Sequence, residues 1–591
     1  MKQFISRRSF LKAAGAATAL TAVSLGAPAA SAEETNCFLG EKSAVTILYT
    51  NDVHTYIDKK SPELTYAGIA ALKQSYVDAG QNVLLVDAGD HIQGTAYGSM
   101  DDGETIIKLM SEAGYDLATP GNHEFDYGMA RAKAAMKEAA FPYVSCNWVD
   151  LRTGLKVLPS IKIFTIGGAR IAFVGVTTPE TFTKSTPAYF MNASQTKYIY
   201  DILGGDDGQK LYKAVQKAID KAKLLGATTI IGLGHLGVDP SSAPWTSEEV
   251  IAHTTGFDAF IDGHSHTVME NKQVTDASGK AVTLTQTGSY FKNVGKMTIG
   301  ADGSITTELL PSYDGADAAV AAATSEWVSA VDDMLGEEIA VGDSKFYITD
   351  PATGKRRIRS AETNLGDFVA DGIYAYFNEV EKLHCDLAIM NGGGIRADVP
   401  AGDWTFKTCK QVSPFGNVAC LMSVTGKQIQ DALEFAARFA GEGGKENGGF
   451  LQVAGATYEI HTDIPNTVQT DEKNVWIGSA TGTPRVQNVK IYDKASGSYL
   501  PLDPGATYAL AGMNYTLRNL GDGFAMFDGA ELIKDYVSED YLVMATYAMI
   551  FDGADAAGLP HLSSANSPLA AYPGYLLNYE QPYGAGRITI L

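Results

Sequence analysis

Side chains that can bind divalent cations follow five short apolar runs in the first half of the sequence. Each run is rich in Val, Ile or Leu, as β-strands are, and helical segments separate the runs. Such alternation predicts an α/β sheet, whose ligand crevice lies at the carboxyl ends of the strands. We therefore expect one crevice to hold the side chains that follow residues 44–50, 82–88, 116–120, 228–234 and 258–262, namely Asp52, His54, Asp90, Asn122, His123, His235, His264 and His266.

The distribution of histidines supports a metal site. The chain has ten histidines, and seven of them fall between positions 54 and 266. Neutral imidazoles combined with Asp and Asn suit borderline divalent cations, whereas an all-oxygen calcium site would not need them. A lone histidine is more often a hydrogen-bonded loop residue, and we keep that interpretation for His91 and His253. Five strand ends with the same chemistry favour a metal site for the others.

Hydrolysis of a phosphate ester is the chemistry that such a site suits. It needs a nucleophile at neutral pH, neutralised phosphoryl oxygens and help for the leaving group. Two cations roughly 3.5 to 4 Å apart supply the first two needs, and a carboxylate between them holds the spacing. Asp52 and His54 stand two residues apart on extended chain, so both can reach one ion.

At these residues the sequence resembles a known family. The segments around the strand ends look like the successive blocks of the calcineurin-like metallophosphoesterases: 52–54, 89–91, 121–124, 234–235 and 263–266. Four later segments resemble the C-terminal domain of the 5'-nucleotidase family, which includes UDP-sugar hydrolases and 2',3'-cyclic-nucleotide phosphodiesterases: 362–366, 391–396, 414–417 and 521–523. The match covers nearly all of the mature chain, in order.

The resemblance implies a fold and a metal centre. The fold is a four-layer αββα sandwich of the α/β class, followed by a second, α+β domain. Two divalent cations (Zn, Mn, Co or Fe) are expected, with Asp90 as the bridging carboxylate. The other ligands match as Asp52, His54 and His266 for one ion, and Asn122, His235 and His264 for the other. The family often has Gln in place of His266, a departure that bears on metal preference and should leave the site intact.

The resemblance also implies a catalytic dyad of His123 and Asp126. In this role His123 stabilises the phosphoryl transition state or protonates the leaving oxygen, and Asp126 orients and charges the imidazole. A purely structural histidine beside the metals is the alternative, which we rank below the dyad.

The second domain is expected to hold the substrate. Arg359 and Arg396 match the phosphate-binding arginines of the family, since a guanidinium offers a fixed fork to phosphoryl oxygens. Phe415 matches one of two aromatic residues that enclose the base; the usual place of the second is Thr516, and Tyr515 is a possible substitute. The remaining matches to ligand contacts are Asn391, Asn417 and Asp522. We interpret the basic run 355–357 as a solvated face.

The first 32 residues predict an export signal. Arg7 and Arg8 precede a weakly apolar, alanine-rich stretch that ends at Ala32, which fits a twin-arginine signal peptide. An ordinary secretory signal and a membrane anchor are the alternatives, but the stretch falls short of the roughly 20 strongly apolar residues of a spanning helix. We expect an exported soluble protein, periplasmic or at the cell surface or outside the cell, that meets the twin-arginine translocase during export.

Composition limits the partners. Acidic residues outnumber basic ones by 22, which disfavours nucleic-acid polymers and anionic membranes. Five cysteines cannot all pair within one chain. Cys409 and Cys420 can form a bridge, but reduced core cysteines are an equally good expectation, and Cys37 lacks the signature of a lipidated cysteine.

Residues 33–591 are too many for one hydrophobic core, so two large domains are expected. We place a metallophosphoesterase domain at 44–310, a connector helix at 314–342 that permits rotation between domains, and a substrate-binding domain at 343–591. A core helix of the second domain is the other interpretation of 314–342. Helices are expected at 66–78, 104–113, 131–139, 210–225, 365–378 and 425–439, and strands at 449–460, 507–513 and 586–591.

These observations predict an exported two-metal hydrolase that removes phosphate from nucleotides, either nucleoside 5'-monophosphates or 2',3'-cyclic nucleotides, by attack of metal-activated water. Thr516 motivates one alternative, a phosphoesterase for sugar phosphates or another non-nucleotide ester. A ligand-binding surface protein without catalysis is a third interpretation, which the presence of His123 and Asp126 disfavours.

Overall fold

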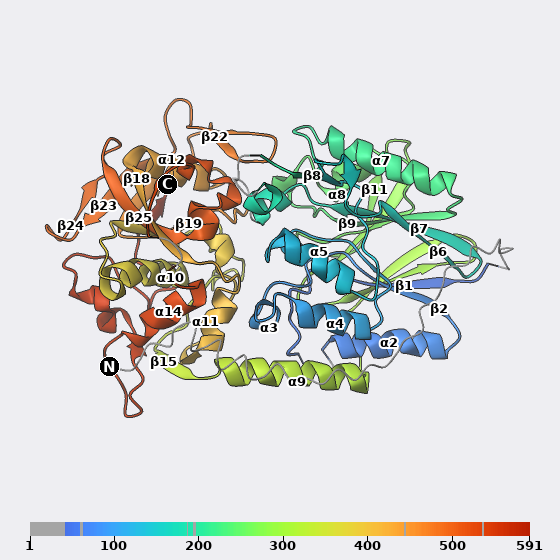
Figure 1. Cartoon of the computed structure of the whole chain (residues 1–591), viewed down its shortest axis with the longest axis horizontal. Coiled ribbons are helices and arrows are strands. Elements are labelled where there is room, and N and C mark those ends of the chain that lie inside the picture. The colour runs from blue at the N-terminus through green and yellow to red at the C-terminus, as the bar shows by residue number, and fades with distance from the viewer. Residues whose placement is uncertain (1–41, 60–62, 186, 193–196, 442–444, 535–536) are drawn as a thin grey trace.

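The computed structural model shows two domains joined by the helix α9 (Ala318–Leu335) (Figure 1). It describes residues 42–59, 63–185, 187–192, 197–441, 445–534 and 537–591. The expected signal peptide, 1–32, and Cys37 lie outside these ranges. None of the helices in the described ranges has the length and apolar character needed to cross a bilayer.

Two sheets pack face to face in the first domain. Strands β1, β2 and β3 run parallel in one sheet, and β7, β9, β10 and β12 run parallel in the other. The first sheet has the order β14 (Ile305–Leu310), β13 (Val294–Ile299), β1 (Val45–Thr50), β2 (Asn82–Asp87) and β3 (Leu117–Ala118). The second has the order β11 (Val268–Thr275), β12 (Ala281–Thr287), β10 (Ala259–Ile261), β9 (Thr229–His235), β7 (Ala169–Thr177) and β6 (Ile161–Ile166).

Alternation along the strands explains the layers. In β1, Val45, Ile47 and Tyr49 point between the sheets, while Leu48 packs with the outer helices. The first sheet is covered by α2 (Tyr66–Asp78), α4 (Glu104–Glu112) and α9. The second sheet is covered by α7 (Gln209–Leu224) and α8 (Ser247–Ala252). The predicted αββα sandwich is therefore confirmed.

Shorter elements of the first domain lie around the sandwich. They are α3 (Ala96–Ser99), η1 (His123–Phe125), α5 (Met129–Glu138), β4 (Trp148–Asp150), β5 (Leu155–Lys156), α6 (Thr181–Lys184), η2 (Pro187–Phe190), β8 (Tyr200–Ile202) and η3 (Pro240–Ser242).

Helix α9 belongs to the packing of the first domain. Asp317 caps its first turn, and Val320, Val331 and Leu335 are buried against α2 and α4. The helix is shorter than the predicted range 314–342. The chain leaves it at Leu335, and β15 (Glu338–Gly342) already pairs with β17 and β27 of the second domain.

The second domain is built on a mixed sheet with the order β19 (Leu451–Ala454), β16 (Leu387–Asn391), β25 (Thr507–Met513), β18 (Ala419–Thr425) and β26 (Glu531–Lys534). Side chains of β16 alternate between two apolar clusters, so both faces of this sheet are buried. The helices that cover it are α10 (Asn364–Ala375), α11 (Phe406–Val412), α12 (Gly426–Ala436) and α14 (Asp540–Met549).

The other strands form smaller sheets at the periphery. They are β17 (Gly402–Thr405), β20 (Ala456–Ile460), β21 (Gln469–Thr470), β22 (Trp476–Gly478), β23 (Val486–Asp493), β24 (Ser498–Pro501), β27 (His561–Leu562) and β28 (Ile588–Ile590). The single strand expected at 449–460 is two strands, because Gly455 adopts φ 69° and turns the chain into a second sheet.

The C-terminal segment is locked into this domain. Strand β28 pairs in parallel with β20. Just before it, the guanidinium of Arg587 is buried and donates to a carboxylate oxygen of Asp371 at 2.8 Å. Cys409 and Cys420 are buried thiols, as are the other two cysteines of the described ranges, so the disulfide considered between them is not formed.

Candidate active site

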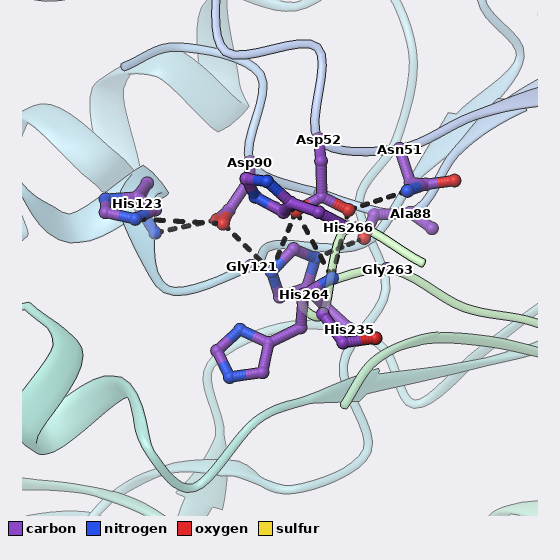
Figure 2. Close-up of polar contacts among 12 residues, drawn as sticks. Asn51, Asp52, Ala88, Asp90, Gly121, His123, His235, Gly263, His264 and His266 are labelled. Carbon is purple, nitrogen blue, oxygen red and sulfur yellow. Dashed lines mark hydrogen bonds and ion pairs between the residues drawn. The ribbon is translucent and has the colours of Figure 1, made fainter. Parts of the chain in front are cut away.

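The predicted metal-binding side chains meet at one edge of the two sheets. Asp52 and Asp90 come from loops after β1 and β2, His235 ends β9, and His264 and His266 follow β10. Figure 2 shows Asp52, Asp90, His235 and His266 converging, with His123 approaching Asp90 from the side. The carboxyl ends of strands from both sheets therefore build a single cluster.

Distances within the cluster are short. His266 Nε2 lies 3.4 Å from Asp52 Oδ1, and His235 Nε2 lies 3.0 Å from Asp90 Oδ2. His54 Nε2 is 3.1 Å from His266 Nε2. Three groups hold their ligand atoms within 4.8 Å of one another: Asp52, His54 and His266; His54, Asp90 and His123; and Asp90, His235 and His264. The first group contains the three side chains predicted for one ion, and the third contains His235 and His264, which were predicted for the other, together with Asp90.

The backbone is strained at this point. Asp52, His54, Asp90, His264 and His266 all have φ between 48° and 78°, a left-handed conformation that non-glycine residues rarely adopt. The extended chain expected at Asp52 and His54 is therefore wrong, although both side chains still reach the same cluster. Each left-handed residue costs on the order of 1 to 3 kcal/mol, and strain of this kind concentrates at functional sites.

Two glycines make room for the cluster. A Cβ on Gly121 would stand 2.3 Å from Asp90 Oδ1, and one on Gly263 would stand 2.8 Å from His235 Nδ1. Any side chain at either position would therefore displace a member of the cluster.

Burial shapes the electrostatics of the cluster. It raises the pKa of Asp52 to about 8, an effect that His235 opposes and Asp90 reinforces. Burial alone would also raise the pKa of Asp90, but His235 and His123 hold it well below its usual range. Burial lowers the pKa of His54 and His266, which favours neutral, metal-binding imidazoles.

The donor set fits divalent cations. Nδ1 of His54 meets the carbonyl oxygen of Gln93 at 2.9 Å, and Nδ1 of His235 meets that of Ala88 at 2.7 Å, so Nε2 of both rings faces the cluster. Within the described residues, Oδ1 of Asn122 is buried without a hydrogen-bond partner. Buried polar atoms of this kind are costly unless a ligand satisfies them, and a bound cation would do so.

His123 and Asp126 form the expected pair beside the cluster. His123 Nδ1 lies 2.5 Å from Asp126 Oδ2, which leaves Nε2 on the side of the cluster, 4.0 Å from Asp90 Oδ2. Burial opposes a charge on this ring, but Asp126 and Asp90 outweigh it and raise the pKa of His123. These carboxylates therefore favour the protonated form of the imidazole.

A cleft of about 1250 Å³, including its open mouth, separates the two domains at this site. The first domain contributes the dyad together with Asp90, Asn122, His264 and His266. Asp52, His54 and His235 lie buried behind this wall. The second domain contributes every predicted substrate residue: Arg359, Asn391, Arg396, Phe415, Asn417, Tyr515 and Asp522.

The cleft gathers several positive charges with few partners. Burial lowers the pKa of the Arg359 guanidinium to about 9, and the charges of Arg356 and Arg396 add to this effect. Nε of Arg359 is buried without a hydrogen-bond partner among the described side and main chains. Arg396 lies over the ring of Phe415, 5.7 Å from its centroid. Such a group of cations favours an anionic ligand.

The aromatic side of the cleft contains Phe415 and Tyr515. Phe415 lies 6.0 Å from the ring of His123, so it stands directly across from the dyad. Tyr515 lines the cleft, whereas Thr516 is buried. The hydroxyl of Tyr515 accepts a hydrogen bond from the backbone N–H of Asp522 at 3.1 Å, and Asn391 donates to that carboxylate at 3.0 Å.

Some cleft residues were not predicted from the sequence. Glu180 lies 2.8 Å from His264 Nε2, and Lys184 lies four residues further along the chain. Arg356, which we interpreted as part of a solvated face, instead lines the cleft and pairs with Glu446 at 2.8 Å. The one signal for Glu180 was its place after the apolar run that forms β7; nothing in the sequence marked Lys184 or Glu446.

Comparison with protein families agrees with this architecture. Residues 45–268 match the calcineurin-like phosphoesterase model, and residues 340–529 match the 5'-nucleotidase C-terminal domain model. Residues 5–24 match the twin-arginine translocation signal sequence, which indicates export. Calcineurin-like phosphoesterases are metal-dependent, in agreement with the donor cluster.

Individual relatives extend the similarity to the whole chain. The human 5'-nucleotidase is 29% identical over 550 residues, which cover 85% of this chain and 88% of that protein. The trifunctional nucleotide phosphoesterase YfkN of Bacillus subtilis is 29% identical over 84% of this chain, which spans only 33% of that longer protein. A 5'-nucleotidase precursor from Thermus thermophilus has the same fold, with a TM-score of 0.72 and 24% identity over 93% of this chain and 99% of that one.

Proposed function

The chain belongs to the 5'-nucleotidase family of phosphoric-ester hydrolases, and on this premise we propose that it removes phosphate from nucleotides after export. The substrates proposed are nucleoside 5'-monophosphates and 2',3'-cyclic nucleotides. One observation carries the proposal: the donor cluster and the His123–Asp126 pair face Arg359, Arg396 and Phe415 across a single cleft.

We assign two divalent cations to the cluster. Asp52, His54 and His266 would hold one, and Asn122, His235 and His264 the other, with Asp90 between them. When bound, cations of this kind acidify water and neutralise phosphoryl oxygens, which supplies a nucleophile at neutral pH. Mixed imidazole, carboxylate and amide donors accept zinc, manganese, iron or cobalt.

His123 provides a proton to the leaving group in this proposal. Asp126 holds Nδ1, so the reactive proton sits on Nε2 at the edge of the cleft. The raised pKa of His123 favours the imidazolium, which can pass that proton to the departing ester oxygen. The imidazole of His123 is then neutral, and it takes up a new proton from solvent while Asp126 holds the ring in place.

The second domain orients the substrate. Arg359 and Arg396 would bind the phosphoryl oxygens through their guanidinium N–H groups. The ring of Phe415 offers a face on which a base can stack, and Tyr515 borders the same space. Asp522, held by Asn391, presents a carboxylate that can accept hydrogen bonds from sugar hydroxyls.

A panel of phosphate esters tests the proposal. Protein saturated with each candidate metal is assayed for phosphate release from a nucleoside 5'-monophosphate, a 2',3'-cyclic nucleotide, a sugar phosphate and p-nitrophenyl phosphate. We expect the highest kcat/KM for a nucleotide. A higher value for the sugar phosphate would contradict the nucleotide assignment, and calorimetric binding of nucleotides without turnover at full metal occupancy would contradict catalysis.

A further inference from the structure

A loop of the second domain contacts the first domain outside the lining of the cleft. This clasp loop, residues 471–475, connects β21 to β22. Lys473 Nζ donates to Asp201 Oδ1 at 2.8 Å and stands 3.7 Å from the ring centroid of Phe182 on α6. Its neighbour Glu472 accepts from Lys210 at 2.9 Å.

The two ion pairs of the clasp loop differ in burial. The side chains of Lys473 and Asp201 are only 17% and 19% exposed, whereas Lys210 and Glu472 are 54% and 40% exposed. An exposed pair contributes little because water screens it. A cation held over an aromatic ring and partly removed from water contributes considerably more. Lys473 therefore contributes more than Lys210 and Glu472 to the stability of this contact between the domains.

The ring under Lys473 leads to the catalytic dyad. Phe182 packs on Phe190 with centroids 4.9 Å apart, and Phe190 packs on Phe125 at 5.2 Å. Phe125 lies in η1, between His123 and Asp126, and all three rings are essentially buried. A continuous chain of contacting aromatic rings thus joins Lys473 of one domain to the 3-10 helix η1 that carries the dyad in the other.

The clasp loop also contacts the segment of the second domain that carries the predicted substrate residue Asp522. A Cβ on Gly523 would stand 2.6 Å from the backbone carbonyl oxygen of Asn474, so the two segments are in close contact. Gly523 follows Asp522 in η6 (Gly521–Gly523), and η6 also packs against α6. Asp522 and its neighbours therefore lie between the clasp loop and the helix that Lys473 grips.

We propose that Lys473 is a positioning residue that holds the Asp522 loop in register with the His123–Asp126 pair. It acts by clamping η6 between the clasp loop and α6, so that the substrate-binding wall meets the catalytic wall at a fixed offset. The proposal rests on the proposed function for its kinetic consequences, but its structural consequence can be measured without any substrate.

The test uses the metal-loaded full-length protein. Lys473→Met removes the charge and keeps the apolar part of the side chain. Lys473→Arg keeps the charge, so it can still form the ion pair and the contact with Phe182. Lys210→Gln removes the exposed ion pair and is the matched control. Each variant is assayed with a nucleoside 5'-monophosphate and with p-nitrophenyl phosphate, which has no sugar to reach Asp522. Small-angle X-ray scattering without substrate reports the separation of the domains.

We expect Lys473→Met to raise KM for the nucleotide about tenfold, in line with the loss of a partly buried cation–π contact and ion pair, while its kcat and its rate with p-nitrophenyl phosphate change much less. Its radius of gyration should increase. Lys473→Arg and Lys210→Gln should both have the KM, kcat and radius of gyration of the wild type.

Equal losses with both substrates would overturn the proposal in favour of a merely structural role, as would a Lys210→Gln effect equal to that of Lys473→Met. If no nucleotide is hydrolysed, the proposed function fails and scattering alone decides: an unchanged radius of gyration for Lys473→Met would then refute the clamp.

Discussion

Glu180 Oε2 lies 2.8 Å from Nε2 of His264, and Ser242 donates to the same carboxylate oxygen at 2.6 Å. Burial would raise the pKa of Glu180, but the hydrogen bond from His264 and the charge of Lys184 lower it to about 2. The carboxylate is therefore ionised at neutral pH and fixes the orientation of the ring, which leaves Nδ1 of His264 to bind a cation.

Replacing Glu180 by Gln should lower metal affinity by roughly 10- to 100-fold, the usual effect of mutating the hydrogen-bond partner of a metal-binding imidazole, because the neutral amide is a weaker acceptor than the carboxylate. Elemental analysis after dialysis against graded chelator measures this. Glu248→Gln, which removes a carboxylate that pairs with Lys272 at a more exposed position, is the control. Metal retention equal to wild type in Glu180→Gln would show that Glu180 does not orient the ligand.

The dyad gives a prediction that separates catalysis from metal binding. His123→Ala should keep its metal and lose about 10²- to 10⁴-fold in kcat, because general acid catalysis contributes on that scale. Metal content and single-substrate kinetics of the same preparation provide the measurement. A parallel fall in metal content and rate would instead make His123 a structural residue.

Gly121 should tolerate no side chain. Gly121→Ala would push a methyl group to 2.3 Å from Asp90 Oδ1 and 2.8 Å from the His235 ring, so we expect a folded protein that has lost most of its bound metal. Circular dichroism and elemental analysis test both parts. Gly505→Ala is the control, because a Cβ there meets its nearest atom at 3.5 Å. Full metal occupancy in Gly121→Ala would mean that the cluster relaxes around the methyl group.

Phe415 should matter for nucleotides only. Stacking of a base on an aromatic ring contributes about 1 to 3 kcal/mol, so Phe415→Ala should raise KM for a nucleoside monophosphate by roughly 5- to 150-fold. KM for a substrate without a base, such as glycerol phosphate, should stay near its wild-type value. If both KM values rise together, Phe415 supports the cleft without stacking on a base.

The buried carboxyl of Asp540 should make the stability of the folded protein depend on pH. It lies at the start of α14, where burial raises the pKa of its carboxyl to about 7 although Lys410 opposes the rise. Because this pKa exceeds that of the unfolded chain, near 4, the neutral carboxyl stabilises the fold below about pH 4, and the contribution is lost as pH rises through 7.

Asp540→Asn should therefore stabilise the protein relative to wild type at pH 8, by at most about 4 kcal/mol, and by much less at pH 5. Urea denaturation at both pH values, at constant metal concentration, measures the difference. The exposed Asp528→Asn serves as the comparison. A stabilisation by Asp540→Asn that does not vary with pH would contradict the raised pKa.

Local sequence signals located much of this fold. Helix α2 has the predicted bounds because Thr65 caps its first turn, accepting from the backbone of Gly68. The donor cluster was predictable for a similar reason, since polar residues after parallel strands share one edge of a sheet. Strand-end position alone was enough to bring Asp52 and His264 together, although 212 residues separate them.

Residues that act through tertiary contact escaped prediction. Arg356 sits in a basic run that has no local reason to face inward, and only the approach of Glu446 makes it part of the cleft. Lys473 lies in an ordinary polar turn, and its role emerges only when Phe182, from the other domain, comes beneath it. The break at Gly455 was equally hidden, because an isolated glycine within an apolar stretch is compatible with a continuous strand.

The burial of Arg587 and the pairing of β28 with β20 bear on when the protein can fold. A buried guanidinium that neutralises Asp371 must be in place before that carboxylate can be enclosed. Residues 587–590 complete this arrangement, so the second domain can close its interior only once they have been synthesised and have paired with β20.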